Sequence, residues 1–393
     1  MATQATLSMR DLMALLKIGD FVGPDASFTG GEDAKSLSEV SLRVCNEVRS
    51  VKRTWHLKKL LVPREGTRIP PVKARRLTVM QLQQPIETVV WPQGLQHLDF
   101  GDCGYKPERF LPGFDQADIS LVTWPAGLKS LKLGFRFNHN LTGVTLPDSL
   151  LELTLGACFN QSLVGVTLPA SLQKLTFEGD FNQSLVGVTL PASLQELTFE
   201  GDFNQSLVGV TLPEGLQMLA FGHDFNQPLV GVTFPDGLRQ LRFGESFNQS
   251  LVGVTLPASL QELTFNICFD QSLVDVCLPD GLQELAFDYR FNQSLVGVSL
   301  PDSLRKLSFD SFFNQPLVGV TLPDSLLELT FGECFNQPLV GVALPASLQK
   351  LTFQGDFNQS LVGVTLPEGL QILAFGHDFN QPLVGVTFPD GLR

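Results

Sequence analysis

The chain has 393 residues, with 27 Lys and Arg against 40 Asp and Glu, and a formal net charge of −13. Hydrophobic residues make up 43% of it, which is enough apolar material for a core and excludes a wholly disordered chain. The acidity disfavours nucleic acid and an anionic membrane as partners, and no apolar stretch reaches the ~18 residues of a membrane span. Six scattered Cys without a CxxC pair favour a reducing compartment, so we expect a cytoplasmic protein.

Residues 1–60 differ in character from the rest of the chain. Residues 1–90 hold 14 Lys and Arg against 9 Asp and Glu. Apolar residues at three-to-four spacing in residues 12–18 and 37–51 predict a helical N-terminal segment over residues 1–60. One interpretation is a cap that shields the first apolar layer of the repeats.

The other interpretation of this segment is a functional domain. The strings LMALLKIGDFVGPDAS and SLSEVSLRVCNEVRSVKRTWH resemble a degenerate F-box. The resemblance implies an adaptor that recruits the linker subunit of a cullin-type ubiquitin ligase. Residues 61–90 are then a basic linker, in which we expect a weaker copy of the later repeat to start at Pro71, with Leu77 and Val79 at its core positions.

Residues 91–393 consist of a repeat. From Pro125 to Pro389, a proline after an apolar residue recurs every 22 residues, in units written P-x-[SG]-L-x-x-L-x-F-x-x-x-F-N-Q-[SP]-L-V-G-V-T-L. Because ~22 residues cannot bury a core of their own, the units must stack as a mostly β solenoid with parallel sheets. Two stretches alternate apolar and outward residues and predict two strands per unit: Leu175-Thr176-Phe177 and Val166-Thr167-Leu168. An extra loop is expected over Tyr105–Gln116, where the first spacing is longer.

The motif Leu-x-x-Leu-x-Phe-x-x-x-Phe-Asn-Gln-[Ser/Pro]-Leu, followed by Leu-Pro-x-Ser-Leu, resembles FNIP repeats, a 22-residue branch of the leucine-rich-repeat superfamily. The resemblance covers about residues 91–393. It implies a curved right-handed solenoid with a parallel sheet on one face.

Two neighbouring columns of the repeat are interpreted as a structural ladder. Stacked Phe rings bury a large apolar area, and Asn amides have donors and acceptors for the turn backbone and the next unit. We expect the column to be weaker at Asp270, which replaces an Asn and only accepts when ionised. In four successive units the ladder residues are Phe159, Asn160, Phe181, Asn182, Phe203, Asn204, Phe225 and Asn226.

Function within the repeats is expected where the units differ. The positions around the Leu-x-Phe strand and in the following loop vary, and they predict a partner-binding surface. Drift in recently copied units explains the same variation equally well. The predicted partner-binding residues are Lys174, Met218, Gln240, Arg242, Tyr289, Arg290, Lys306 and Phe312.

The sequence therefore predicts a non-enzymatic repeat scaffold for protein–protein interaction. It contains no HExxH, Gly-rich phosphate loop or GxSxG motif, so we expect neither a cofactor nor a metal. A substrate adaptor of a ubiquitin ligase is the first alternative. An ice-binding solenoid is the second, based on an outward Thr column that includes Thr167. The chain stops at Arg393 without a divergent cap, so end-to-end self-association is also expected.

Overall fold

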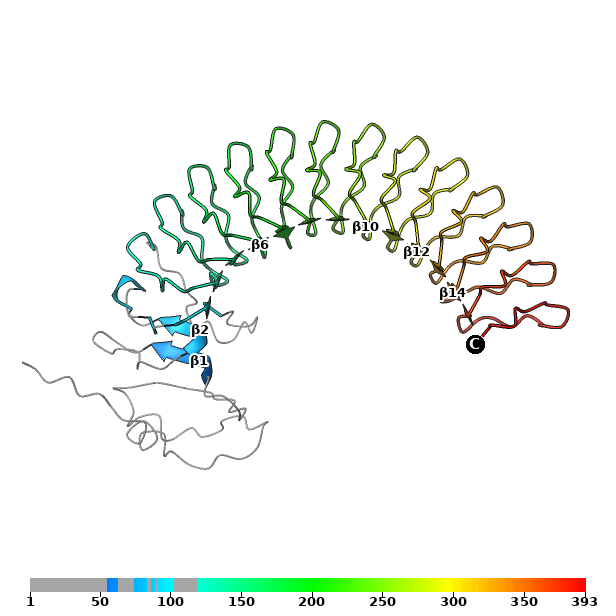
Figure 1. The fold of residues 1–393 in the computed structure, drawn as a ribbon, viewed down its shortest axis with the longest axis horizontal. Helices are drawn as coiled ribbons and strands as arrows, with labels where there is room; N and C mark the ends of the chain where they lie inside the picture. Colours follow the sequence, from blue (N-terminus) through cyan, green and yellow to red (C-terminus); the bar gives the residue numbers. More distant parts are fainter. Residues whose placement is uncertain (1–54, 63–73, 83–85, 90, 93, 102–118) are drawn as a thin grey trace, which may run out of the picture. The chain divides into compact units, whose positions relative to one another are not determined.

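The computed structural model describes residues 55–62, 74–82, 86–89, 91–92, 94–101 and 119–393. All of them belong to one unit of the chain, Leu42–Arg393. This unit is built on a 15-stranded sheet in which the strand order follows the chain order (Figure 1). A short 3-10 helix, η2 (Ile86–Thr88), precedes the third strand. The strands are β1 (Trp55–Val62), β2 (Ala74–Leu82), β3 (His97–Asp99), β4 (Ser130–Lys132), β5 (Glu152–Leu155), β6 (Lys174–Phe177), β7 (Glu196–Phe199), β8 (Met218–Ala220), β9 (Gln240–Arg242), β10 (Glu262–Phe265), β11 (Glu284–Phe287), β12 (Lys306–Phe309), β13 (Glu328–Phe331), β14 (Lys350–Phe353) and β15 (Ile372–Ala374).

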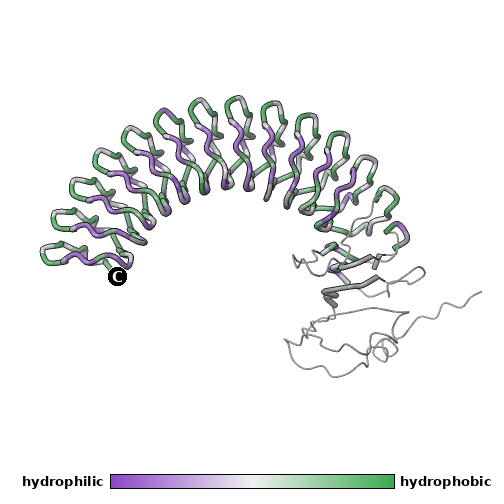
Figure 2. The backbone as a smooth tube through the Cα atoms, turned by 180° about the vertical axis from the view of Figure 1, so that it is seen from behind, coloured by the Kyte–Doolittle hydropathy of each residue, from purple (hydrophilic) through white to green (hydrophobic). Residues whose placement is uncertain are grey.

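From β3 onward, each strand is the Leu-x-Phe stretch of one repeat, and successive repeat strands pair in parallel with a register of one period. Leu175 of β6 lies opposite Leu197 of β7, and Phe177 lies opposite Phe199. The Leu and Phe side chains point inward and are buried, whereas the residues between them face outward. Figure 2 shows the same succession of hydrophobic and hydrophilic segments from turn to turn. The 22-residue period is therefore one turn of a parallel β solenoid.

Two columns of Phe rings fill the interior of the stack. Within one turn the rings of Phe243 and Phe247 lie 3.9 Å apart, centroid to centroid. Between turns the rings of Phe247 and Phe269 lie 6.1 Å apart and nearly parallel. Neighbouring strands are separated by only ~4.8 Å, so the turns lie closer together in the sheet than at this column. The row of turns therefore curves, with the strands along its inner side (Figure 1).

The prediction of a second strand in each unit is wrong. Val166 and Leu168 are buried and Thr167 is exposed, so the predicted alternation is correct, but this segment belongs to no sheet. Over the described residues, the solenoid has one parallel sheet, not several. The physical reason is the curvature, because turns that are further apart outside the sheet exceed the reach of a backbone N–H···O=C bond.

Asn side chains bridge this wider gap on the flank of the stack. The Asn160 Oδ1 atom accepts hydrogen bonds from the backbone N–H of Asn182 (3.0 Å) and from the Gln183 Nε2 atom (3.0 Å) in the next turn. The same pair of bonds recurs from Asn138 to Asn358. A side chain thus supplies the acceptor that the more distant backbone cannot supply.

The expectation of a weaker rung at Asp270 is not supported by the geometry. The Asp270 Oδ1 atom accepts from the Asn292 N–H at 3.0 Å and from the Gln293 Nε2 atom at 2.9 Å, as the Asn residues do. The bonds described at this column use the side-chain oxygen as an acceptor. A carboxylate serves this role as well as an amide does.

The Leu-Val-Gly-Val segment of each unit forms a tight turn at the outer end. The N–H of Val188 donates to the carbonyl of Leu185 at 3.0 Å, and Gly187 between them has a φ of 82°. A β-turn with positive φ at its third position requires Gly or a residue that tolerates the left-handed region. One copy departs from this rule, because Asp275 occupies the position with a φ of 63°.

Replacing Asp275 by Gly is expected to raise the free energy of unfolding by about 1 kcal/mol, because Gly removes the cost of a left-handed residue with a Cβ atom. The reciprocal change, Gly253→Asp, is expected to lower it by a similar amount. A Cβ atom at Gly253 meets no atom within 4 Å, so only the backbone conformation differs. Urea denaturation of both variants tests this. Equal midpoints for Asp275→Gly, Gly253→Asp and the unaltered protein would contradict it.

The N-terminal predictions fall largely outside the described residues. Of the helical segment expected over residues 1–60, residues 55–60 belong to strand β1 and are not helical. The remaining residues 1–54, with the F-box interpretation, and the loop expected at Tyr105–Gln116 lie outside the described part of the chain, apart from Trp55 and His56 at the end of the F-box-like string. Strand β2 pairs in parallel with β3, with Leu77 opposite Leu98, and both Leu77 and Val79 are buried.

Candidate interaction surface

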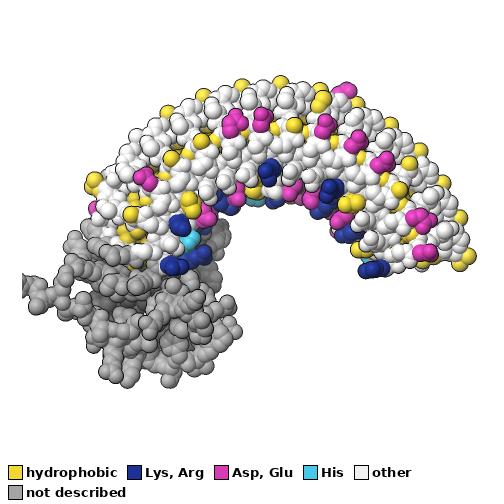
Figure 3. Space-filling model, viewed as in Figure 1, with side chains coloured by type: hydrophobic (Ala, Val, Ile, Leu, Met, Phe, Trp, Pro, Cys, Tyr) yellow, Lys and Arg dark blue, Asp and Glu magenta, His cyan; other side chains and the backbone are white. Residues whose placement is uncertain are grey.

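The inner edge of the stack carries a row of charged side chains (Figure 3). They are the outward-facing residues of the strands, and the parallel register places one beside the next at successive turns. Opposite charges at adjacent positions form ion pairs. The pairs are Lys174–Glu196 (2.8 Å), Arg242–Glu262 (3.2 Å), Lys306–Glu284 (3.4 Å) and Lys350–Glu328 (3.7 Å).

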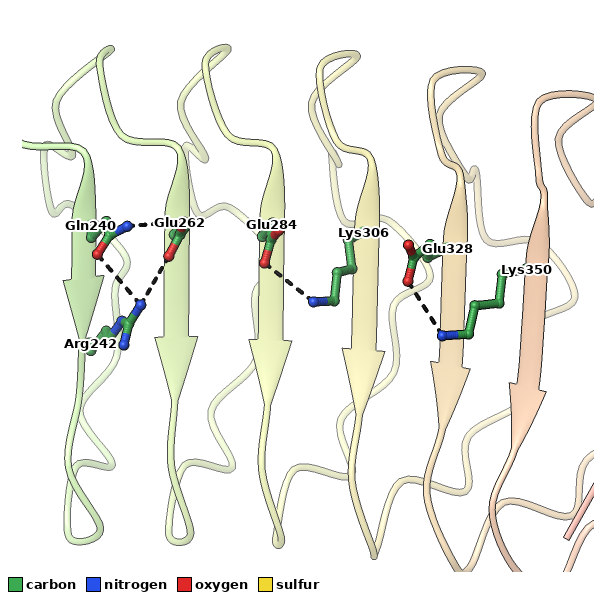
Figure 4. A network of polar contacts seen from close by, with 7 residues as sticks. All are labelled: Gln240, Arg242, Glu262, Glu284, Lys306, Glu328 and Lys350. Atoms are coloured by element: carbon green, nitrogen blue, oxygen red, sulfur yellow. Dashed lines mark hydrogen bonds and ion pairs between the residues drawn. The ribbon is translucent and has the colours of Figure 1, made fainter. Parts of the chain in front are cut away.

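These ion pairs occupy several of the side chains predicted to bind a partner. Gln240 donates from Nε2 to Glu262 at 3.0 Å, and Arg242 lies against both Gln240 and Glu262 (Figure 4). The hydrogen bond to Glu196 raises the pKa of the Lys174 amine above its usual value. Because opposite charges pair along the strands, this face has little unbalanced charge with which to attract a partner.

A second surface lies in the loops after β11 and β12. The rings of Tyr289 and Phe312 meet edge to face with centroids 4.7 Å apart, and each residue is 43% exposed. We call these two residues the aromatic patch. In other turns the Tyr289 position holds Gly179 or Gly201, and the Phe312 position holds Asp180 or Asp202.

Backbone hydrogen bonds between successive loops hold the two rings together. The N–H of Phe312 donates to the carbonyl of Tyr289 at 2.9 Å. The same bond joins Cys158 to Phe135 (2.8 Å) and Ser246 to His223 (2.8 Å), so it belongs to the repeat. Residues 23 apart in these loops are therefore diagonal neighbours, and the patch rests on a fixed frame.

Two carboxyl groups adjoin the aromatic patch. Asp288 precedes Tyr289 and accepts a 2.8 Å hydrogen bond from its N–H, while Asp310 accepts one from the Ser311 hydroxyl at 3.3 Å. Partial burial, together with a side-chain hydrogen bond to Asp310, raises the pKa of Asp288 above its usual value, and the charge of Glu245 adds to this. We call Asp288 and Asp310 the acidic pair. Like charges held this close favour any change that neutralises them.

The eight predicted partner-binding residues fall into two groups. Lys174, Met218, Gln240, Arg242 and Lys306 lie on strands of the inner face, whereas Tyr289, Arg290 and Phe312 lie in the loops. Sequence reasoning identified both aromatic residues but did not pair them, and it omitted the acidic pair. The signal that joins the rings is the separation of 23 residues, one more than the period, which acquires meaning only once the hydrogen bonds between loops are known.

The remaining surface offers little chemistry. An open hollow of about 450 Å³ lies between two turns and is lined by residues without a titratable side chain, among them Gly165, Thr167, Ala170 and Pro191. Among the described residues, no three His, Cys, Asp or Glu side chains lie close enough to hold a metal ion. Within the same part of the chain, no helix is long and apolar enough to cross a membrane.

The Thr column lies outside the sheet. Thr167 and its counterparts are exposed, but they belong to segments that form no strand, on turns that follow a curved row (Figure 1). A flat array of hydroxyls, as the ice-binding alternative needs, therefore has no sheet beneath it. The exposed Val column at the outer turns, which includes Val186 and Val208, follows the same curve.

Stacked 22-residue turns, one parallel sheet along the inner side and buried Leu and Phe columns define a solenoid of the leucine-rich-repeat kind. The family model described as FNIP Repeat matches seven segments of the chain. They are residues 114–158, 159–202, 203–246, 225–268, 269–312, 313–356 and 357–393. The chain belongs to the FNIP-repeat family.

Solved structures show the same fold. The chain is similar to CroV588, described as a novel circular LRR protein, with 37% identity and a TM-score of 0.68 over 82% of this chain. The match covers 49% of CroV588, so the chain spans about half the length of that protein. YopM from Yersinia enterocolitica WA-314 is 17% identical with a TM-score of 0.39, over 87% of this chain and 83% of YopM. The sequence matches none of the curated proteins.

Proposed function

We propose that this protein is a non-enzymatic scaffold that binds a protein partner through the aromatic patch. The observation that carries the proposal is the exposure of Tyr289 and Phe312, two large rings in mutual contact on a loop surface where other turns hold Gly or Asp. Aromatic residues are enriched among the residues that dominate binding energy at interfaces. Their backbone is tied to the neighbouring turns, so binding requires little ordering of the loops.

The patch is a better candidate than the inner strand face. Cations of the strand face, such as Lys174 and Arg242, already have carboxylate partners within the chain. A partner would have to displace these ion pairs and would gain little from doing so. The rings, by contrast, expose apolar area that a partner can remove from water.

The double variant Tyr289→Ser, Phe312→Ser tests the proposal, because Ser occupies the same loop positions in Ser311 and Ser246. Affinity capture from a lysate of the source cells is expected to lose a specific partner with this variant. The matched control is Phe135→Ser, which removes a ring of equal exposure (43%) at the Tyr289 position seven turns earlier. Identical captured proteins for the unaltered chain, the double variant and the control would refute the aromatic patch as the binding site.

A further inference from the structure

The aromatic patch differs from an ordinary apolar contact because acidic groups surround it. Asp288 and Asp310 are joined by a side-chain hydrogen bond. Each lies next to a patch residue or one residue removed from it along the chain. Glu245 acts on Asp288 from two turns away, and Glu333 and Asp356 raise the pKa of the Cys334 thiol, after its burial, in the loops of the next turns.

The acidic pair has little positive charge within the chain to offset it. Where Glu196, Glu262, Glu284 and Glu328 on the strands have Lys or Arg partners, no described ion pair includes Asp288 or Asp310. Arg290 is the nearest cation in sequence, and its backbone N–H is bonded to Ile267 while its side chain is exposed. The loop surface thus combines two exposed rings with an unbalanced negative charge.

We infer that the aromatic patch and the acidic pair together bind a basic segment of the partner protein, with Arg or Lys side chains that contact both the rings and the carboxylates. The inference rests on the proposed function and specifies the chemistry of the partner. Cations are attracted to aromatic faces, and a guanidinium pairs with carboxylates through charge-assisted hydrogen bonds. A bound cation would also relieve the repulsion between Asp288 and Asp310.

The geometry explains why both features are needed. An acidic surface alone would attract any cation weakly and in a salt-dependent manner, and rings alone would accept any apolar side chain. Their position on successive loops, fixed by the bond from the Phe312 N–H to the Tyr289 carbonyl, presents both to one extended segment. Arg is favoured over Lys because its planar group both stacks on rings and bonds carboxylates in a fork.

Fluorescence anisotropy with short labelled peptides tests the inference on the full chain. The probes are peptides of alternating Arg and Gly, Lys and Gly, and Glu and Gly. We expect the Arg peptide to bind more tightly than the Lys peptide and the Glu peptide not to bind. The variants Tyr289→Ser, Phe312→Ser and Asp288→Asn, Asp310→Asn should each weaken binding of the Arg peptide about tenfold.

Two controls distinguish a site from general attraction to an acidic chain. The variant Asp180→Asn, Asp202→Asn removes two exposed carboxylates from loops of earlier turns, and Phe135→Ser removes an exposed ring. Both should leave the affinity for the Arg peptide unchanged, and circular dichroism should show that all variants are folded. Equal weakening by the Asp180, Asp202 variant, or no binding of the Arg peptide, would overturn the inference.

The outcome separates this inference from the proposed function. If the Tyr289, Phe312 variant loses its partner from the lysate while the Arg peptide does not bind, the scaffold proposal stands and the basic partner is wrong. If the Arg peptide binds in the expected manner while captured proteins do not change, the peptide site stands and its use as the scaffold's binding site is wrong.

Discussion

Replacing Phe247 by Ala is expected to lower the free energy of unfolding by about 3–5 kcal/mol. The side chain is fully buried, and its ring lies 3.9 Å from that of Phe243 and 6.0–6.1 Å from those of Phe225 and Phe269. The substitution therefore opens a cavity that borders three turns. Because each turn contacts only its neighbours, the backbone amides of these turns should also exchange hydrogen faster than those of distant turns.

Urea denaturation and hydrogen exchange measure the two effects. The matched control is Val252→Ala in the same turn, where the side chain is 48% exposed. This change should alter the free energy of unfolding by no more than about 0.5 kcal/mol. Equal effects of Phe247→Ala and Val252→Ala, or faster exchange spread uniformly over all turns, would show that the Phe columns do not hold the turns together.

The second large effect is expected at the Asn column. Replacing Asn314 by Ala should cost about 1–3 kcal/mol of stability. Its Oδ1 atom accepts from the Asn336 N–H and from the Gln337 Nε2 atom, both at 3.0 Å. Removal of the acceptor leaves a partly buried backbone N–H without a partner where the next backbone carbonyl is too distant to replace it.

The variant Asn314→Asp separates the acceptor role from the rest of the amide. It retains the oxygen, as Asp270 does in its own turn, so it should cost much less than Asn314→Ala. Thermal and urea unfolding of both variants provide the comparison. A cost for Asn314→Asp as large as that for Asn314→Ala would mean that the amide group contributes through its nitrogen, contrary to the hydrogen bonds of this column.

The two surfaces of the solenoid have different consequences for evolution of binding. Charges on the inner strand face, such as Lys306 and Glu284, pair with the adjacent turn, so a change at one position affects its neighbour. Loop residues such as Tyr289 and Phe312 project from a frame that the backbone bonds of the repeat already fix. Substitutions in the loops can therefore alter recognition with little effect on the stack.

The repeat also explains which predictions succeed. Leu175 and Phe177 are recognisable as core because a buried position must recur at every turn of a stack, and recurrence is visible in the sequence. The partner-binding residues do not recur. Variation at Lys174 and at Tyr289 looks alike in the sequence, yet the first forms an ion pair across the sheet and the second forms an exposed ring contact.

By itself, the sequence determined the solenoid, its 22-residue turn, its Leu and Phe core and the position of one strand in each unit, because a strict period imposes the same environment on every copy. Only the tertiary structure decided that Val166-Thr167-Leu168 forms no strand, that Asn and Asp270 serve equally as acceptors, and that Tyr289 meets Phe312. These features depend on the distance between turns, which is short in the sheet and longer elsewhere. Neither that distance nor the diagonal contact between loops can be read from the residues of a single unit.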